Sequence, residues 1–152
     1  MTLLDKYKSS AGFAVGFNEK LSIENAVFEA IERYILQQWT DGIISLEKFD
    51  VILENNLAKT FFEKFDQIQF LKKRVNTKFK DLEIDFQIIV CIAFKGDGIF
   101  WGSKAHFNEN KCIQHSLIEA FRNLNVFNNL NKSNIFEVSY VDDVIFHFGS
   151  GK

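Results

Sequence analysis

The sequence predicts an α+β fold in which an antiparallel or mixed sheet packs with two helices on one of its faces. Residues 84–94, IDFQIIVCIAF, are rich in β-branched and aromatic residues, which is typical of a buried strand. Two segments, 22–39 and 110–125, repeat apolar residues at helical spacing. The chain has 152 residues, 47% of them hydrophobic, which is enough for one domain over 1–152 with a core of its own.

A third observation is a weak internal repeat. Six of the fourteen positions 17–30 are identical to the positions 90 residues further along, and the shared residues in the first copy are Phe17, Asn18, Glu19, Ile23, Glu29 and Ala30. We interpret this as a duplication of units at about 11–40 and 97–127. Two such units can face each other across a pseudo-twofold axis, so we expect their glutamates to converge.

The first unit is predicted as a strand followed by a helix. Residues 11–17, AGFAVGF, form the strand, Asn18 or Ser22 caps the helix, and Asp41-Gly42 ends it. One apolar stripe of this helix is expected to pack inward, and it comprises Ile23, Ala26, Val27, Ala30, Ile31 and Tyr34.

The middle of the chain is harder to interpret. We expect one helix near 54–65, then a short strand and an exposed basic connection up to residue 82, with the basic residues as a solvated face. Residues 84–94 form the buried strand, 95–98 a hairpin turn and 99–105 the partner strand.

The second helix is predicted over 110–125. Its inward residues are Ile113, Leu117, Ala120, Phe121 and Leu124. We expect a loop or frayed end at 125–134, and then two strands at 135–140 and 143–148.

Composition limits the function classes. The net charge of −2 argues against a dedicated nucleic-acid binder, and the absence of a run of 18 apolar residues argues against a membrane span. The first ten residues lack the pattern of a signal peptide, so we expect a cytoplasmic protein. Cys91 and Cys112 are interpreted as buried thiols, although a disulfide stays open, and no zinc-ligand spacing occurs.

The candidate chemistry lies on the polar flanks of the two predicted helices. At 100° per residue the first flank carries Asn25, Glu29, Glu32 and Arg33, and the second carries His115, Glu119, Arg122 and Asn123. Carboxylates one turn apart suit Mg²⁺, which takes one or two protein oxygens and completes its shell with water and phosphate. Arginine pairs with phosphate oxygens. A surface charge array is the commoner meaning of such a pattern, but the repeat favours a site.

The segment GFAVGFNEKLSIENAVFEAIERY resembles the first nucleotide-binding motif of YcaO-domain proteins, Ser-x-x-x-Glu-x-x-Glu-Arg after a glycine-rich strand. IQHSLIEAFRN, after GIFWGSKA, resembles the second motif. The resemblance implies Mg²⁺ and ATP as cofactors, with Glu29, Glu32 and Glu119 as metal ligands. It further implies nucleotide contacts, which we assign to Asn25, Arg33, Arg122 and Asn123.

The sequence also departs from the family pattern. Asn25 and His115 stand where the motifs have serine, and Asn123 stands where the second motif closes with Gln or Arg. We find no third, arginine-containing motif, and family members are usually more than twice this length.

Two functional hypotheses follow from the resemblance. In the first, the chain binds MgATP and takes part in ATP-dependent modification of peptide backbone amides. In the second, it is a catalytically inactive YcaO-like scaffold that binds a partner protein. An unrelated α+β interaction protein is a third interpretation. We also expect a homodimer with a phenylalanine-rich surface at its interface, because the chain is small and its site is incomplete.

Overall fold

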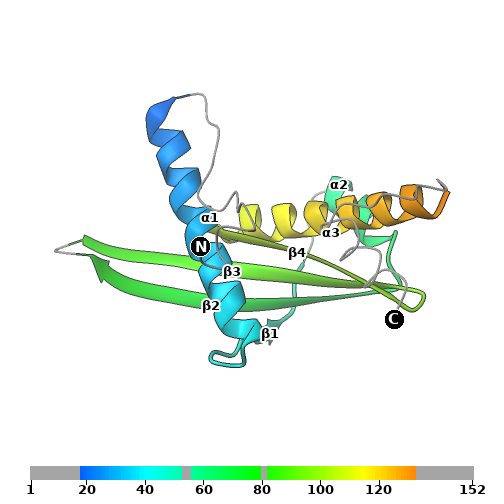
Figure 1. Cartoon of the computed structure of the whole chain (residues 1–152), viewed down its shortest axis with the longest axis horizontal. Helices are drawn as coiled ribbons and strands as arrows, with labels where there is room; N and C mark the ends of the chain where they lie inside the picture. Colours follow the sequence, from blue (N-terminus) through cyan, green and yellow to red (C-terminus); the bar gives the residue numbers. More distant parts are fainter. Residues whose placement is uncertain (1–17, 53–55, 80–81, 133–152) are drawn as a thin grey trace, which may run out of the picture. The chain divides into compact units, whose positions relative to one another are not determined.

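The computed structural model describes residues 18–52, 56–79 and 82–132. The strands predicted at 11–17, 135–140 and 143–148 lie outside these residues. The chain forms two compact units, Met1–Ser45 and Leu46–Lys152, and each is described by itself. In chain order the elements are α1 (Glu19–Thr40), β1 (Glu47–Phe49), α2 (Asn56–Phe62), β2 (Gln67–Phe79), β3 (Leu82–Lys95), β4 (Gly98–His106) and α3 (Glu109–Lys132) (Figure 1).

Helix α1 begins and ends where its capping residues predict. Asn18 is the N-cap, and its side-chain oxygen accepts a hydrogen bond from the Leu21 N–H at 2.9 Å. Asp41 is the C-cap, and Gly42 follows with a φ of 72°, a left-handed conformation that glycine adopts at low cost. Of the two predicted N-caps, the structure therefore selects Asn18.

The predicted inward stripe of α1 is wrong for four of its six residues. Ile23, Val27 and Tyr34 are 56%, 50% and 65% exposed. Ala30 is also exposed, whereas Ala26 and Ile31 are half-buried. The buried residues of the helix are Phe28, Glu32, Ile35 and Leu36. Apolar residues occur on two opposite sides of this helix, and helical spacing alone does not distinguish which side is covered.

The second unit is built on an antiparallel sheet with the strand order β1-β2-β3-β4. Strands β2 and β3 form one long hairpin, paired from Gln67↔Phe94 to Phe79↔Leu82. The exposed connection predicted before residue 82 is therefore wrong, since this segment is strand. Its charges hide the strand pattern in the sequence, and two of them are paired in the fold: Lys72 with Glu109, and Arg74 with Asp85.

The hairpin of β3 and β4 confirms the sequence prediction. Ile88, Ile89, Cys91 and Ala93 are fully buried, so neighbouring residues on both faces of β3 are covered. Gly96 in the turn has a φ of 57°. Asp66 holds this turn, because its carboxylate accepts from Lys95 Nζ at 2.7 Å and from the Gly96 N–H at 2.8 Å.

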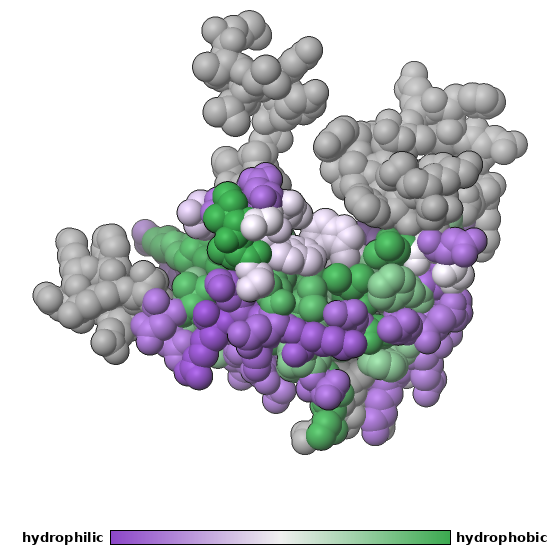
Figure 2. Space-filling model, turned by 90° about the horizontal axis from the view of Figure 1, so that it is seen from below, coloured by the Kyte–Doolittle hydropathy of each residue, from purple (hydrophilic) through white to green (hydrophobic). Residues whose placement is uncertain are grey.

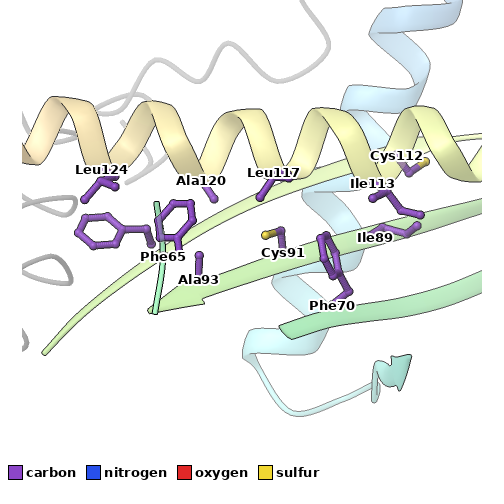
Figure 3. Packing of buried hydrophobic residues seen from close by; sticks show 11 residues of the cluster. Phe65, Phe70, Ile89, Cys91, Ala93, Cys112, Ile113, Leu117, Ala120 and Leu124 are labelled. Atoms are coloured by element: carbon purple, nitrogen blue, oxygen red, sulfur yellow. The ribbon is translucent and has the colours of Figure 1, made fainter. Parts of the chain in front are cut away.

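Helix α3 packs on the sheet through the predicted residues. Ile113, Leu117, Ala120 and Leu124 are buried, and they meet Cys91, Phe65 and other sheet-side residues in one core (Figure 3). The helix runs to Lys132, so the loop predicted from residue 125 is wrong over its first eight residues. Phe127 is half-buried and packs against Phe100 with the two rings tilted and their centroids 5.6 Å apart, which extends the helix contact beyond the predicted end.

The remaining predictions on this unit concern α2 and the cysteines. Helix α2 lies within the predicted range 54–65 but is shorter. Cys91 and Cys112 are both buried and free thiols, which confirms that interpretation, and burial raises the pKa of Cys91 well above its ordinary value.

The molecular surface carries some exposed apolar side chains. Figure 2 shows one face on which hydrophilic residues form a broad band, with hydrophobic residues gathered beside it. Among the described residues, no helix is long and apolar enough to cross a membrane.

Candidate nucleotide and metal site

The candidate site in the second unit lies where α3 crosses close to β4. A Cβ placed on Gly102 of β4 would lie 2.2 Å from the backbone oxygen of Ser116, 2.6 Å from Glu119 Cβ and 2.8 Å from the Ala120 nitrogen. All three are far inside van der Waals contact. Only glycine allows the helix and the strand to approach this closely.

Because α3 and β4 approach each other closely, Glu119 forms a hydrogen bond with the strand. Its Oε2 accepts a hydrogen bond from the Ser103 backbone N–H at 2.8 Å, in a part-buried position. One turn further along, Asn123 Nδ2 donates to the Trp101 carbonyl oxygen at 2.8 Å. Because β4 is the last strand of the described sheet, these two side chains satisfy backbone groups on its outer edge.

The Ser103 bond is compatible with a metal-binding role for Glu119. A carboxylate has two oxygens and about four acceptor directions, so one N–H does not exhaust it. Carboxylate oxygen is also a ligand type that Mg²⁺ prefers. The Glu119 side chain is half-buried and held in one orientation, which suits coordination better than a freely rotating surface glutamate does.

The other candidate residues of α3 are more exposed. Arg122 and His115 lie at the surface, where they can reach a ligand in solvent. Ser116, beside His115, is fully buried, and its hydroxyl donates to the Ile113 carbonyl oxygen at 3.0 Å. The serine next to the motif position is therefore part of the helix packing.

The first unit carries the other half of the predicted set on α1. Asn25 and Glu29 are half-buried, Glu32 is 8% exposed and Arg33 is exposed. Glu29 and Glu32 stand one helical turn apart, on the side of α1 that also carries the buried Phe28 and Leu36. A carboxylate in such a partly desolvated position favours a cation as its partner.

The structure thus brings Glu119 and Asn123 together on α3, and Glu29 and Glu32 together on α1. Convergence of the two sets stays a prediction. Within the described ranges, no group of three or more His, Cys, Asp or Glu side chains has the arrangement of a metal site. Mg²⁺ does not require one, because it commonly takes one or two carboxylates and phosphate oxygens. The donor chemistry on α1 and α3 therefore fits this ion.

Sequence reasoning missed two contributors to the site, Gly102 and the Ser103 backbone N–H. The only signal for them is the glycine in GIFWGSKA, because a glycine inside a strand often marks close approach of another backbone. The partner of that approach cannot be deduced from the strand alone.

These features define an α+β protein whose carboxylate-bearing helices suit a hard cation. The sequence matches, over residues 5–145, the family model described as YcaO cyclodehydratase, ATP- and Mg²⁺-binding. The chain therefore belongs to the YcaO family, as the two motifs predicted.

A solved structure supports the same fold. The chain is similar to YcaO from Methanopyrus kandleri, a structure bound with AMPPCP and Mg²⁺, with a TM-score of 0.62 and 11% sequence identity. The similarity covers 92% of this chain and 38% of that one, so the chain spans well under half the length of the protein it matches. No curated protein matches the chain.

Proposed function

We propose that this YcaO-family chain binds MgATP through the polar flanks of α1 and α3. The observation that carries the proposal is Glu119, a part-buried carboxylate fixed at the contact of α3 and β4, at the position where the second YcaO motif has its glutamate. The family description and the nucleotide-bound neighbour support the choice of ligand.

The proposed roles follow from chemistry and exposure. Glu29, Glu32 and Glu119 supply oxygen ligands to Mg²⁺. Arg33 and Arg122 are exposed, and their guanidinium groups pair with phosphate oxygens. Asn25 and Asn123 contribute side-chain amides at the edge of the nucleotide. Asn123 would do so through its amide oxygen, because its amide nitrogen already donates to the Trp101 carbonyl oxygen. Bound MgATP supplies a transferable phosphoryl group that can activate an amide oxygen.

We propose that the chain takes part in the modification of peptide backbone amides. Catalysis by the chain alone is the less favoured form of the proposal, because the similarity covers only 38% of the solved YcaO. A scaffold role is favoured by that observation: the chain holds nucleotide or a partner protein, and the rest of the site lies outside these 152 residues. Cytoplasmic localisation belongs to the same proposal.

The first test is calorimetry of MgATP binding to the wild type, Glu29→Gln and Glu19→Gln. Both substitutions remove one carboxylate from α1, but Glu19 is exposed in the first turn, away from the proposed site. We expect Mg²⁺-dependent binding in the wild type and in Glu19→Gln, and a loss of at least tenfold in Glu29→Gln. Binding that is independent of Mg²⁺, or equal in all three proteins, would rule out the assignment.

The homodimer is retained as a proposal with a changed surface. Most described phenylalanines are covered, and only Phe62 and Phe107 are among the exposed large hydrophobic residues. The exposed side of α1, with Ile23, Val27 and Tyr34, is the better candidate for the contact. Sedimentation equilibrium tests it: a monomer at high concentration would exclude the dimer.

A further inference from the structure

The contact of α3 with β4 carries an inference that rests on the proposed MgATP site, adds Gly102 to it and gives Asn123 a second role. We propose that Gly102 and Asn123 are positioning residues, which hold the Glu119 carboxylate against the Ser103 N–H and thereby set the affinity of the site for Mg²⁺.

A side chain at position 102 would force α3 and β4 apart. The nearest atoms to a Cβ at this position belong to the helix backbone and to the Cβ of Glu119, none of which is the flexible end of a side chain. The obstacle can be relieved only by movement of the helix or the strand. Since carbon contacts favour separations of about 3.5 Å, the contact at 2.2 Å requires a displacement on the order of 1 Å.

Such a displacement would break the hydrogen bond between Glu119 and β4. Its bond to the Ser103 N–H is 2.8 Å long, so a shift of about 1 Å takes the two atoms beyond hydrogen-bond distance. The carboxylate then loses the group that selects its rotamer. Asn123 acts in the same direction, because its bond to the Trp101 carbonyl ties the next turn of α3 to the same strand.

The orientation of the Glu119 carboxylate affects the affinity of the proposed site for Mg²⁺. Ligating carboxylates are themselves hydrogen-bonded in metal sites, and removal of such an outer partner typically costs about 10–100-fold in metal affinity. The Ser103 N–H is one outer partner of Glu119 in this chain. A backbone donor is the stiffest available choice, because β4 is fixed on its other side by pairing with β3.

The experiment compares the wild-type chain with Gly102→Ala, Asn123→Ala and Ile99→Ala. Ile99→Ala is the control, because Ile99 is an exposed residue near the start of β4 and its substitution retains the backbone N–H that binds Glu119. Two quantities are measured for each protein: the Mg²⁺ dependence of ATP affinity, and hydrogen exchange of the Ser103 amide without metal or nucleotide. ATP affinity is also measured in EDTA, where Mg²⁺ is removed. A purely structural defect would lower this affinity as well, so it serves as the reference.

We expect Gly102→Ala to weaken Mg²⁺-dependent binding roughly 10–100-fold, with little change of ATP affinity in EDTA, and to speed exchange of the Ser103 amide. Asn123→Ala adds no bulk, so it tests the same idea if Gly102→Ala fails to fold. Because Asn123 is also a proposed nucleotide contact, ATP affinity in EDTA should fall as well, and the positioning role predicts a further loss in the presence of Mg²⁺. Ile99→Ala should match the wild type in both measurements.

The outcomes that overturn the inference are distinct from failure of the proposed function. Wild-type Mg²⁺ dependence in both Gly102→Ala and Asn123→Ala would overturn the positioning role while the nucleotide site stands. If ATP affinity fell equally with Mg²⁺ and in EDTA, the substitutions would act on packing, and the positioning role would be overturned. A wild type that protects the Ser103 amide but shows no Mg²⁺-dependent binding would overturn the proposed function, and the metal-linked inference with it.

Discussion

At the scale of single residues, Glu119 combines a structural and a proposed ligand role, and two substitutions separate them. Glu119→Ala leaves the buried Ser103 N–H without its partner, which we expect to cost about 1–3 kcal/mol of unfolding free energy. Glu119→Gln keeps an oxygen acceptor and should cost less than about 1 kcal/mol. Both should lose Mg²⁺-dependent ATP binding, because neither keeps the charge.

Urea unfolding and calorimetry on the same protein samples check this prediction. If Glu119→Gln retains wild-type Mg²⁺ dependence, the carboxylate is purely structural, and the second motif has no metal role in this chain. Equal destabilisation by the two substitutions would instead contradict the hydrogen bond as the source of the stability.

Asp66 gives a prediction on pH. The hydrogen bond from Lys95, and then that from the Gly96 N–H, hold the pKa of Asp66 below its ordinary value. A lowered pKa in the folded state means that the carboxylate stabilises the fold above the unfolded pKa, near 4, and that this stability is lost as pH falls through the folded pKa. Asp66→Asn should therefore be less stable than the wild type at pH 7 and closer to it at pH 3.

Urea midpoints of the two proteins at pH 7 and pH 3 measure that difference. The Arg74–Asp85 ion pair is present in both proteins, so its own acid sensitivity cancels in the comparison. A gap between the two midpoints that stays constant from pH 7 to pH 3 would contradict the role of Asp66 in the turn.

At the scale of elements, α1 shows how far periodicity reaches. The helix, its cap at Asn18 and its end at Asp41 could be predicted, because they depend on local residues. The covered face could not, because apolar residues such as Val27 and Phe28 belong to different faces of the same helix, about 100° apart around its axis. Which side is covered depends on the rest of the fold, and the sequence interval around the helix does not contain that information.

A pair of neighbouring substitutions tests the face of α1. Phe28 is 3% exposed, so Phe28→Ala should cost about 3–5 kcal/mol. Val27 is 50% exposed, so Val27→Ala should change the stability by no more than about 0.5 kcal/mol. Chemical denaturation at low protein concentration, where a dimer would dissociate, gives both values. If Val27→Ala were more destabilising than Phe28→Ala, the covered face of α1 would be the stripe that the sequence predicted.

Strand β2 shows a different limit of sequence reasoning. Lys72, Lys73 and Arg74 in succession are typical of an exposed connection, yet they lie in a long strand. Their compensating partners, among them Glu109 on α3 and Asp85 on β3, are distant in the chain. The buried strand β3 and the hairpin turn at Gly96 were predictable because their signals are local and apolar.

At the scale of the whole molecule, the resemblance of two motifs identified the family, whereas the geometry of the site came only from tertiary contacts. Glu29 and Glu119 were found by repetition in the sequence. The roles of Gly102 and Ser103 depend on α3 crossing β4, which no local pattern encodes. The structure does not show the internal duplication, and the first predicted strand lies outside the described residues.

The partial coverage of the solved YcaO leads to the last prediction, which separates binding from turnover. If the nucleotide site is held by α1 and α3, MgATP at 100 times its dissociation constant should raise the unfolding free energy by about 2.7 kcal/mol. Because most of the matched protein has no counterpart in these 152 residues, we expect no ATP hydrolysis by this polypeptide alone. Thermal denaturation and phosphate release, measured on one sample with Glu119→Gln as the control, test both parts. Stabilisation without hydrolysis would favour the scaffold, and hydrolysis lost in Glu119→Gln would make the chain a minimal enzyme. Stabilisation of the wild type and the control alike would place the nucleotide elsewhere on the chain.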